Sequence, residues 1–133
     1  MKKITKEGKI QEEFKDVPTE MTPLPPGFEW ANLDIENKEE LDQLTDFINE
    51  FYVESQDNDD FRLCFDASYL YWVMTKPGNK MEWQLKVINS KNKKIMAFIM
   101  CAEIELSLFD QKHKAAEVNF LLTHKKLREK KLG

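Results

Sequence analysis

The segment Ala115–Gly133 constrains the fold most, because an apolar run ends abruptly in a basic one. The run Val118–Leu122 contains Phe120, Leu121 and Leu122 without regular polar alternation, which is typical of a strand buried on both faces. The following stretch, His124–Lys131, is almost entirely basic and is followed by a glycine at residue 133. On hydrophobicity alone the strand is best interpreted as plain core. The basic turn could hold an anion through its cations and backbone N–H groups.

Charge is distributed unevenly along the 133 residues. The net charge is −4, but residues 125–133 carry five basic residues against one acid, so the rest of the chain stands at −8. A basic end and an acidic middle could serve two ligands of opposite charge, or both could be ordinary solvated faces. The acids of the middle segment, against Arg62 alone, are Asp46, Glu50, Glu54, Asp57, Asp59, Asp60 and Asp66.

Composition indicates one folded domain. An apolar fraction of 41% with 11% aromatic residues argues against disorder. No apolar run approaches the roughly 20 residues of a membrane span. The amino terminus is charged where a signal peptide needs an apolar region, so a cytoplasmic protein is expected. Cys64 and Cys101 have no CxxC partner and are predicted to be reduced, mostly buried thiols.

The pattern divides the chain into an extended or disordered arm over residues 1–26 and a domain over residues 27–133. The prolines of TPLPPG favour an extended path, and Phe28 and Trp30 are expected to anchor the arm.

Two helices are expected next. Asn37 with Glu40 has the pattern of a capping box and opens a helix over Lys38–Val53. Asp66 is predicted to cap a second, short helix that Pro77-Gly78 ends. The first helix has one apolar stripe, formed by Leu41, Leu44, Phe47, Ile48 and Phe51.

From residue 81 the spacing of the apolar residues changes from the helical period to alternation, one apolar residue in every two. Alternation over Met81–Val87 predicts a strand, and Ile95–Leu108 predicts a long strand or a bulged pair. Turns are predicted at Asn89–Lys93 and at Asp110–Lys114, and the strand Val118–Leu122 follows the second. Helices followed by an antiparallel meander indicate an α+β fold.

Several sites are disfavoured. His113 and His124 are too few for a zinc centre, so no metal is expected. Cys64 with His124 could pair as nucleophile and base, but nothing in their spacing brings them together. The basic run Lys125–Lys131 could in principle bind nucleic acid. It contains no interleaved aromatic residues, however, and the domain as a whole is not basic, so no nucleic acid is expected as a partner.

Five features carry a resemblance: Pro23–Trp30 (PLPPGFEW), Asn49–Glu54 (NEFYVE), Phe61–Leu63 (FRL) before Ser68–Trp72 (SYLYW), Pro77-Gly78 and, above all, Glu117–Gly133 (EVNFLLTHKKLREKKLG). Over residues 18–133 the chain resembles the N-terminal lobe of the protein N-myristoyltransferases. The resemblance implies a GNAT-like acyl-CoA N-acyltransferase fold, a mixed and mostly antiparallel sheet flanked by helices, here truncated after the phosphate loop. It also implies transfer of myristate from myristoyl-CoA, the co-substrate, to an N-terminal glycine, with no tightly bound cofactor.

The resemblance assigns the acyl-CoA site to the basic end. The backbone N–H groups of Phe120 and Leu121 would form an oxyanion hole facing the thioester carbonyl. Leu122 and Thr123 would continue along the pantetheine arm, and the turn Arg128–Gly133 would take the pyrophosphate. The implied cofactor-binding residues are Phe120, Leu121, Leu122, Thr123, Arg128, Glu129, Lys130, Lys131, Leu132 and Gly133.

The same resemblance assigns a peptide groove to the acidic middle. Its substrates would be peptides that begin with glycine and carry a basic residue downstream, for which the aspartates are the implied partners. The implied peptide-binding residues are Tyr52, Val53, Glu54, Asp57, Asp59, Asp60, Phe61, Arg62, Phe65 and Asn119.

The family's catalytic base is the carboxylate at the end of a second lobe, which this sequence does not contain. Little turnover by this chain alone is therefore expected. The alternative is a non-catalytic module that binds acyl-CoA or a partner chain along the strand edge at Leu122. An acetyl-CoA-dependent acyltransferase of the same fold is a weaker alternative, which the specific EVNFL and YVE matches disfavour.

Overall fold

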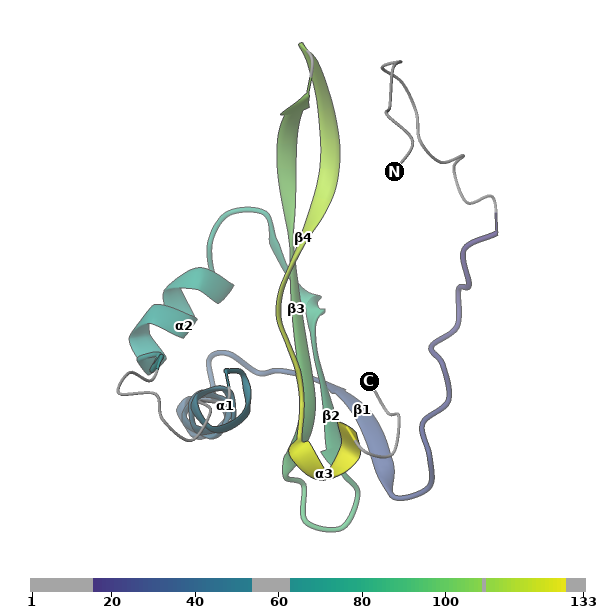
Figure 1. The fold of residues 1–133 in the computed structure, drawn as a ribbon, viewed down its shortest axis with the longest axis vertical. Coiled ribbons are helices and arrows are strands. Elements are labelled where there is room, and N and C mark those ends of the chain that lie inside the picture. Colours follow the sequence, from purple (N-terminus) through teal and green to yellow (C-terminus); the bar gives the residue numbers. More distant parts are fainter. Residues whose placement is uncertain (1–15, 54–62, 109, 129–133) are drawn as a thin grey trace, which may run out of the picture.

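The computed structural model describes residues 16–53, 63–108 and 110–128, and within these ranges it contains one four-stranded antiparallel sheet. The strand order is β1-β2-β3-β4, so each strand lies beside the next one along the chain (Figure 1). The elements are β1 (Phe28–Asn32), α1 (Lys38–Phe51), α2 (Ala67–Met74), β2 (Asn79–Asn89), β3 (Ile95–Leu108), β4 (Gln111–Thr123) and α3 (Lys125–Arg128). The predicted α+β order is confirmed.

Helix α1 begins as its sequence predicts, with one difference in its cap. The Asn37 side chain accepts hydrogen bonds from the N–H groups of Glu39 and Glu40. The reciprocal half of the expected capping box is absent, because the Glu40 carboxylate accepts from the N–H of Asp34 instead. The helix ends at Phe51, two residues before the predicted end.

Strand β1 was not predicted as a strand. Phe28 and Trp30 were interpreted only as anchors of an arm, but Phe28–Asn32 pairs in register with Asn89–Leu85 of β2. The described part of the arm, residues 16–26, contains no helix or strand. The Trp30 ring N–H donates to the Thr22 carbonyl at 3.0 Å and so connects this segment to β1.

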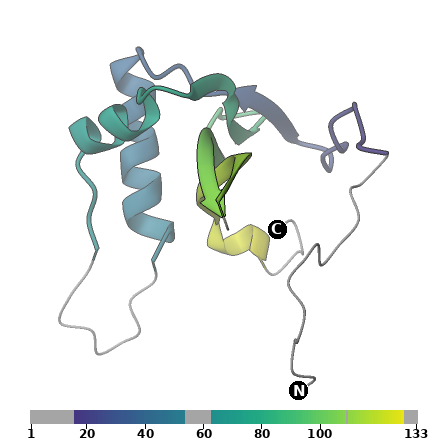
Figure 2. The ribbon, with the colours of Figure 1, turned by 90° about the horizontal axis from the view of Figure 1, so that it is seen from above.

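Helices α1 and α2 lie together on one side of the sheet (Figure 2). Phe98, Met100 and Ala102 of β3 point toward them and are almost fully buried. On the other side, Val118 is 55% and Leu121 is 65% exposed. The prediction that Val118–Leu122 is buried on both faces is therefore wrong. Only one of its faces is covered by the described elements.

The predicted alternation of β2 is present, but the face toward the helices is its polar one. Gln84 is fully buried and donates to the Met74 carbonyl at the end of α2, at 2.8 Å. The Lys86 ammonium, in a side chain only 8% exposed, forms a salt bridge with Glu40 in the first turn of α1. A hydrogen-bonded ion pair thus connects the sheet to the helix layer.

This ion pair predicts an acid-sensitive contribution to stability. Burial of the Glu40 carboxyl raises its pKa, but Lys86 and the Asp34 N–H outweigh burial and leave the pKa below the ordinary 4.5. Because the folded pKa lies below the unfolded one, the stabilisation is complete above about pH 4.5 and is lost as the pH falls through the lowered value. Glu40→Gln is expected to lower the free energy of unfolding by about 2 kcal/mol at pH 7, since the carboxylate is partly exposed.

Urea unfolding of wild type and variant from pH 7 to pH 3 checks this. The difference in free energy of unfolding between wild type and Glu40→Gln should shrink in acid. The matched control is Glu39→Gln, at the exposed neighbouring residue. If the loss of stability in Glu40→Gln stayed constant from pH 7 to pH 3, the result would contradict a stabilising Glu40–Lys86 ion pair.

Strand β3 has the predicted bounds, whereas β4 is longer than predicted, and the hairpin of the two extends past the other strands (Figure 1). The predicted turn Asp110–Lys114 is confined to its start, because Gln111–Lys114 pair with Leu108–Glu105. On one face of this projection Lys112 pairs with Glu105 and Lys114 with Glu103. These cross-strand ion pairs explain how a charged segment that resembles a turn continues the strand. Within the described ranges no helix is long and apolar enough to cross a membrane.

Candidate functional site

A bulge interrupts β4 at the residues predicted to form an oxyanion hole. Phe98 pairs with Leu122 and Met100 pairs with Asn119, so Ile99 alone lies opposite both Phe120 and Leu121. In a β-bulge the extra residue leaves the regular ladder and the strand bends. The structure therefore places a local break in backbone pairing at Phe120 and Leu121.

Phe120 at this bulge has φ +49°, in the left-handed region. A bulky residue rarely adopts this conformation, which costs on the order of 1–2 kcal/mol. Strain of this kind is retained where the surrounding structure determines it, often at functional sites. Here the Phe120 side chain is only 3% exposed, so its packing holds the strained backbone in place.

The Phe120 N–H is already hydrogen-bonded. It donates to Oδ1 of its neighbour Asn119 at 3.0 Å. Asn119 is predicted to contact a peptide, and in this structure its Oδ1 accepts the hydrogen bond of a predicted oxyanion donor. A ligand carbonyl at Phe120 would therefore replace the amide oxygen of Asn119 as acceptor.

An aromatic cluster packs against the bulge from the helix side. The Phe120 ring lies 5.4 Å from Tyr52 and 5.3 Å from Phe65, centroid to centroid, and Phe65 stacks on the half-exposed Tyr69 at 5.8 Å. Tyr52 and Phe65, both predicted to line the peptide groove, are thus brought together beside the predicted oxyanion donors. Val53, the third described residue of that wall, is 47% exposed.

Asn49 holds this cluster together, a role that the sequence does not predict. Its amide oxygen accepts from the Phe65 N–H at 2.7 Å, and its amide nitrogen donates to the Phe65 carbonyl at 2.9 Å. The pair of bonds attaches residue 65 to α1 across the acidic segment. The available signal was an asparagine, a weak helix former, inside an otherwise well-patterned helix.

The basic stretch after β4 begins as a helical turn. Lys125–Arg128 form α3, and the His124 ring nitrogen Nδ1 accepts from the Lys126 N–H at 3.2 Å, as a capping side chain does. The His124 ring also packs on Phe51, with centroids 4.5 Å apart. His124 therefore connects the start of α3 to the end of α1.

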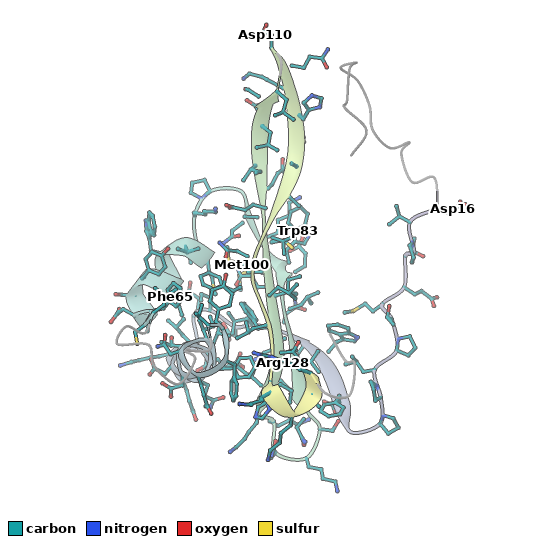
Figure 3. The ribbon with its side chains drawn as sticks, viewed as in Figure 1. Asp16, Phe65, Trp83, Met100, Asp110 and Arg128 are labelled. Atoms are coloured by element: carbon teal, nitrogen blue, oxygen red, sulfur yellow. The ribbon has the colours of Figure 1, made fainter. Side chains whose placement is uncertain are left out.

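Arg128 is a predicted pyrophosphate ligand, and in this structure its guanidinium contacts the protein backbone. Nε donates to the Thr123 carbonyl at 2.8 Å, and Nη2 donates to the Phe51 carbonyl at 2.6 Å. Figure 3 shows Arg128 at the end of the sheet opposite the hairpin tip at Asp110, with Phe65 on the helix side. Thr123 is half-buried and ends β4, and Leu122 is buried in the core.

Several predicted site residues lie outside the described ranges, so the structure does not place them. Among the described residues, no group of three or more His, Cys, Asp or Glu side chains could hold a metal ion. The undescribed site residues are Glu54, Asp57, Asp59, Asp60, Phe61, Arg62, Glu129, Lys130, Lys131, Leu132 and Gly133.

An open groove of about 630 Å³ adjoins the Phe51–His124 contact. Asp46 and Glu50 of α1 supply acids, and Lys93 and Lys94 from the β2–β3 turn supply cations. With both signs of charge it has no evident preference for an anion, and sequence reasoning did not identify it. Its remaining lining residues are Gln43, Phe47, Phe51, Asn92, Ile95 and His124.

Residues 8–133 match the family model described as "Myristoyl-CoA:protein N-myristoyltransferase, N-terminal domain". The chain is 39% identical over 130 residues to glycylpeptide N-tetradecanoyltransferase 2 of Bos taurus, covering 98% of this chain and 26% of that protein. It is 44% identical over 106 residues to glycylpeptide N-tetradecanoyltransferase of Aspergillus fumigatus, covering 80% of this chain and 21% of the relative.

Among solved structures, the fold is similar to Saccharomyces cerevisiae N-myristoyltransferase with bound myristoyl-CoA. The TM-score is 0.84 at 32% identity, over 98% of this chain and 30% of that one. The chain therefore spans about a fifth to a quarter of the length of the two curated relatives, although most of this chain is aligned with them.

Proposed function

This chain belongs to the myristoyl-CoA:protein N-myristoyltransferase family, and from that premise we propose that it supplies the acyl-CoA-binding part of a glycylpeptide N-tetradecanoyltransferase. The reaction moves the myristoyl group from the sulfur of myristoyl-CoA to the amine of an N-terminal glycine. The C–S bond breaks and a C–N bond forms, CoA leaves as its free thiol, and the proton that the amine loses balances the proton that the thiolate gains. The co-substrate is myristoyl-CoA, and the fold is the GNAT-like α+β fold of this family.

The observation that carries the proposal is the bulge at Phe120 and Leu121. During attack by the amine, negative charge develops on the thioester oxygen. Backbone N–H groups that face this oxygen stabilise the charge, and one such donor commonly contributes about 3 kcal/mol to the barrier. A bulge suits this role because it takes backbone groups out of the ladder, whatever side chains the strand carries.

The peptide would approach beside the aromatic cluster. Tyr52 and Phe65 pack on Phe120, so a glycine amine that reaches the bulge passes their rings. The acidic residues of the middle segment would pair with a basic residue downstream of the glycine. The same proposal places the protein in the cytoplasm, in the biosynthesis of lipid-modified proteins, where acyl-CoA and nascent N-termini meet.

Two measurements on the 133-residue chain test the function. Calorimetric titration is expected to show tighter binding of myristoyl-CoA than of CoA, because the acyl chain adds apolar area. Transfer to a peptide that begins with glycine and carries a lysine is expected to be slow, since about three-quarters of each full-length relative has no counterpart here. A peptide beginning with alanine is the control. Absence of myristoyl-CoA binding would overturn the proposal, and rapid transfer would overturn the expectation of slow turnover.

A second candidate is a non-catalytic module that binds acyl-CoA or a partner chain. The outer edge of β4 pairs with no strand in the described ranges, and Val118 and Leu121 are exposed beside it. Such an edge can accept a strand from another chain. Binding of myristoyl-CoA with no detectable transfer, even when the rest of a family enzyme is added, would favour this candidate.

A further inference from the structure

Arg128 joins two main-chain carbonyls that belong to different elements. Its Nε–H bonds the carbonyl of Thr123, at the end of β4, and its Nη2 bonds the carbonyl of Phe51, at the end of α1. The second bond spans 77 residues of sequence. Charge-assisted hydrogen bonds of this length are stronger than neutral ones.

The end of α1 needs a cation. The last carbonyls of a helix have no partner within the helix, and they carry its partial negative charge. The last turn of α1 contains no basic residue, and it contains an acid, Glu50. Arg128 therefore supplies from α3 the cationic cap that the sequence of α1 lacks.

Both carbonyls adjoin the bulge. Tyr52, the residue after Phe51, packs its ring 5.4 Å from that of Phe120. Thr123 lies three residues after Phe120 in the same strand. Removing the guanidinium would break the direct connection between the strand end and the helix end on either side of the Phe120 ring.

We propose that Arg128 is a positioning residue for the oxyanion bulge and acts through the carbonyls of Phe51 and Thr123 rather than as a ligand of the pyrophosphate. The inference rests on the proposed function of the bulge. It differs from what the family resemblance implies for this position. An anion at Arg128 would share the guanidinium with two backbone carbonyls.

Arg128→Lys separates the two roles, because lysine keeps the charge that a phosphate needs but loses the planar fork that bonds two carbonyls at once. The matched control is Lys125→Met, which removes a cation from the same helical turn and leaves both carbonyl contacts intact. The probes are myristoyl-CoA and S-myristoylpantetheine, which lacks the pyrophosphate. Arg128→Lys is expected to lower the affinity for both probes by the same factor, about tenfold. The control is expected to leave the affinity for S-myristoylpantetheine unchanged. Weakening confined to myristoyl-CoA would identify a pyrophosphate ligand and overturn the proposal.

Amide hydrogen exchange provides a readout that needs no ligand. In Arg128→Lys the amides of Tyr52, Phe120 and Leu121 should exchange about tenfold faster than in wild type, at matched global stability, and in the control they should not change. Unchanged exchange in Arg128→Lys would overturn the proposal. If the wild-type chain binds neither probe, the proposed function fails, and the exchange result still decides whether Arg128 holds the bulge.

Discussion

Phe120→Ala is expected to lower the free energy of unfolding by about 4 kcal/mol, the largest effect predicted for a single side chain here. The ring is nearly fully buried and contacts both Tyr52 and Phe65, so its removal leaves a cavity at the centre of the aromatic cluster. The cavity cannot close easily, because Asn49 fixes the backbone of residue 65 through two hydrogen bonds. Urea unfolding measures the loss.

The positive φ of Phe120 leads to a second expectation for the same site. In an ordinary strand position glycine is less stable than alanine by about 0.5–1 kcal/mol. At φ +49° alanine bears a left-handed cost that glycine does not, so Phe120→Gly should be at least as stable as Phe120→Ala. Leu122, buried two residues later without a positive φ, is the matched control, and there alanine should be more stable than glycine. If the alanine variant were more stable than the glycine variant at both sites, the result would contradict the bulge geometry.

Gly78→Ala is expected to cost about 3 kcal/mol, the second-largest effect. Gly78 has φ +90°, and a Cβ there would lie 2.8 Å from the carbonyl oxygen of Glu103. The left-handed backbone costs about 1–2 kcal/mol, and displacing a β3 carbonyl adds a similar amount. The displacement also strains the bond from the Glu103 N–H to the Gly78 carbonyl.

Gly27→Ala is the control that isolates the clash. Gly27 has φ +91°, but nothing lies within 4 Å of the added Cβ, so only the backbone cost of about 1–2 kcal/mol applies. If the two variants unfold with the same dependence of free energy on urea concentration, their urea midpoints give the difference in stability between them. Equal losses would show that the close approach of Gly78 to β3 is not retained in solution.

Much of the fold follows from local patterns. The apolar stripe and cap of α1, the Asp66 cap of α2 and the alternation of β2 are short-range signals, and each predicted element exists. Strand β1 was missed because a five-residue edge strand next to prolines has little pattern of its own. It becomes a strand by pairing with β2. The early start of β4 was also missed, because its charged residues pair with β3 across the hairpin and not along the sequence.

The site was predicted only in part. The motif located the strand with Phe120 and Leu121, and the structure puts a bulge there. No sequence pattern indicates that the Asn119 side chain accepts the Phe120 N–H, or that Arg128 reaches the carbonyl of Phe51. Both contacts depend on where the end of β4 meets α1, a tertiary relation with no periodic signal. The burial of β4 was overestimated for the same reason, since hydrophobicity does not show which face the described helices cover.

The titration with myristoyl-CoA, followed residue by residue through backbone and side-chain amide NMR signals, tests the central claim most directly. The account predicts that the largest shifts fall on the N–H groups of Phe120 and Leu121. The side-chain amide of Asn119 should move with them, because the thioester oxygen replaces its Oδ1 as acceptor. Shifts that leave these three residues unchanged, for example ones confined to the groove lined by Asp46 and Lys94, would contradict it.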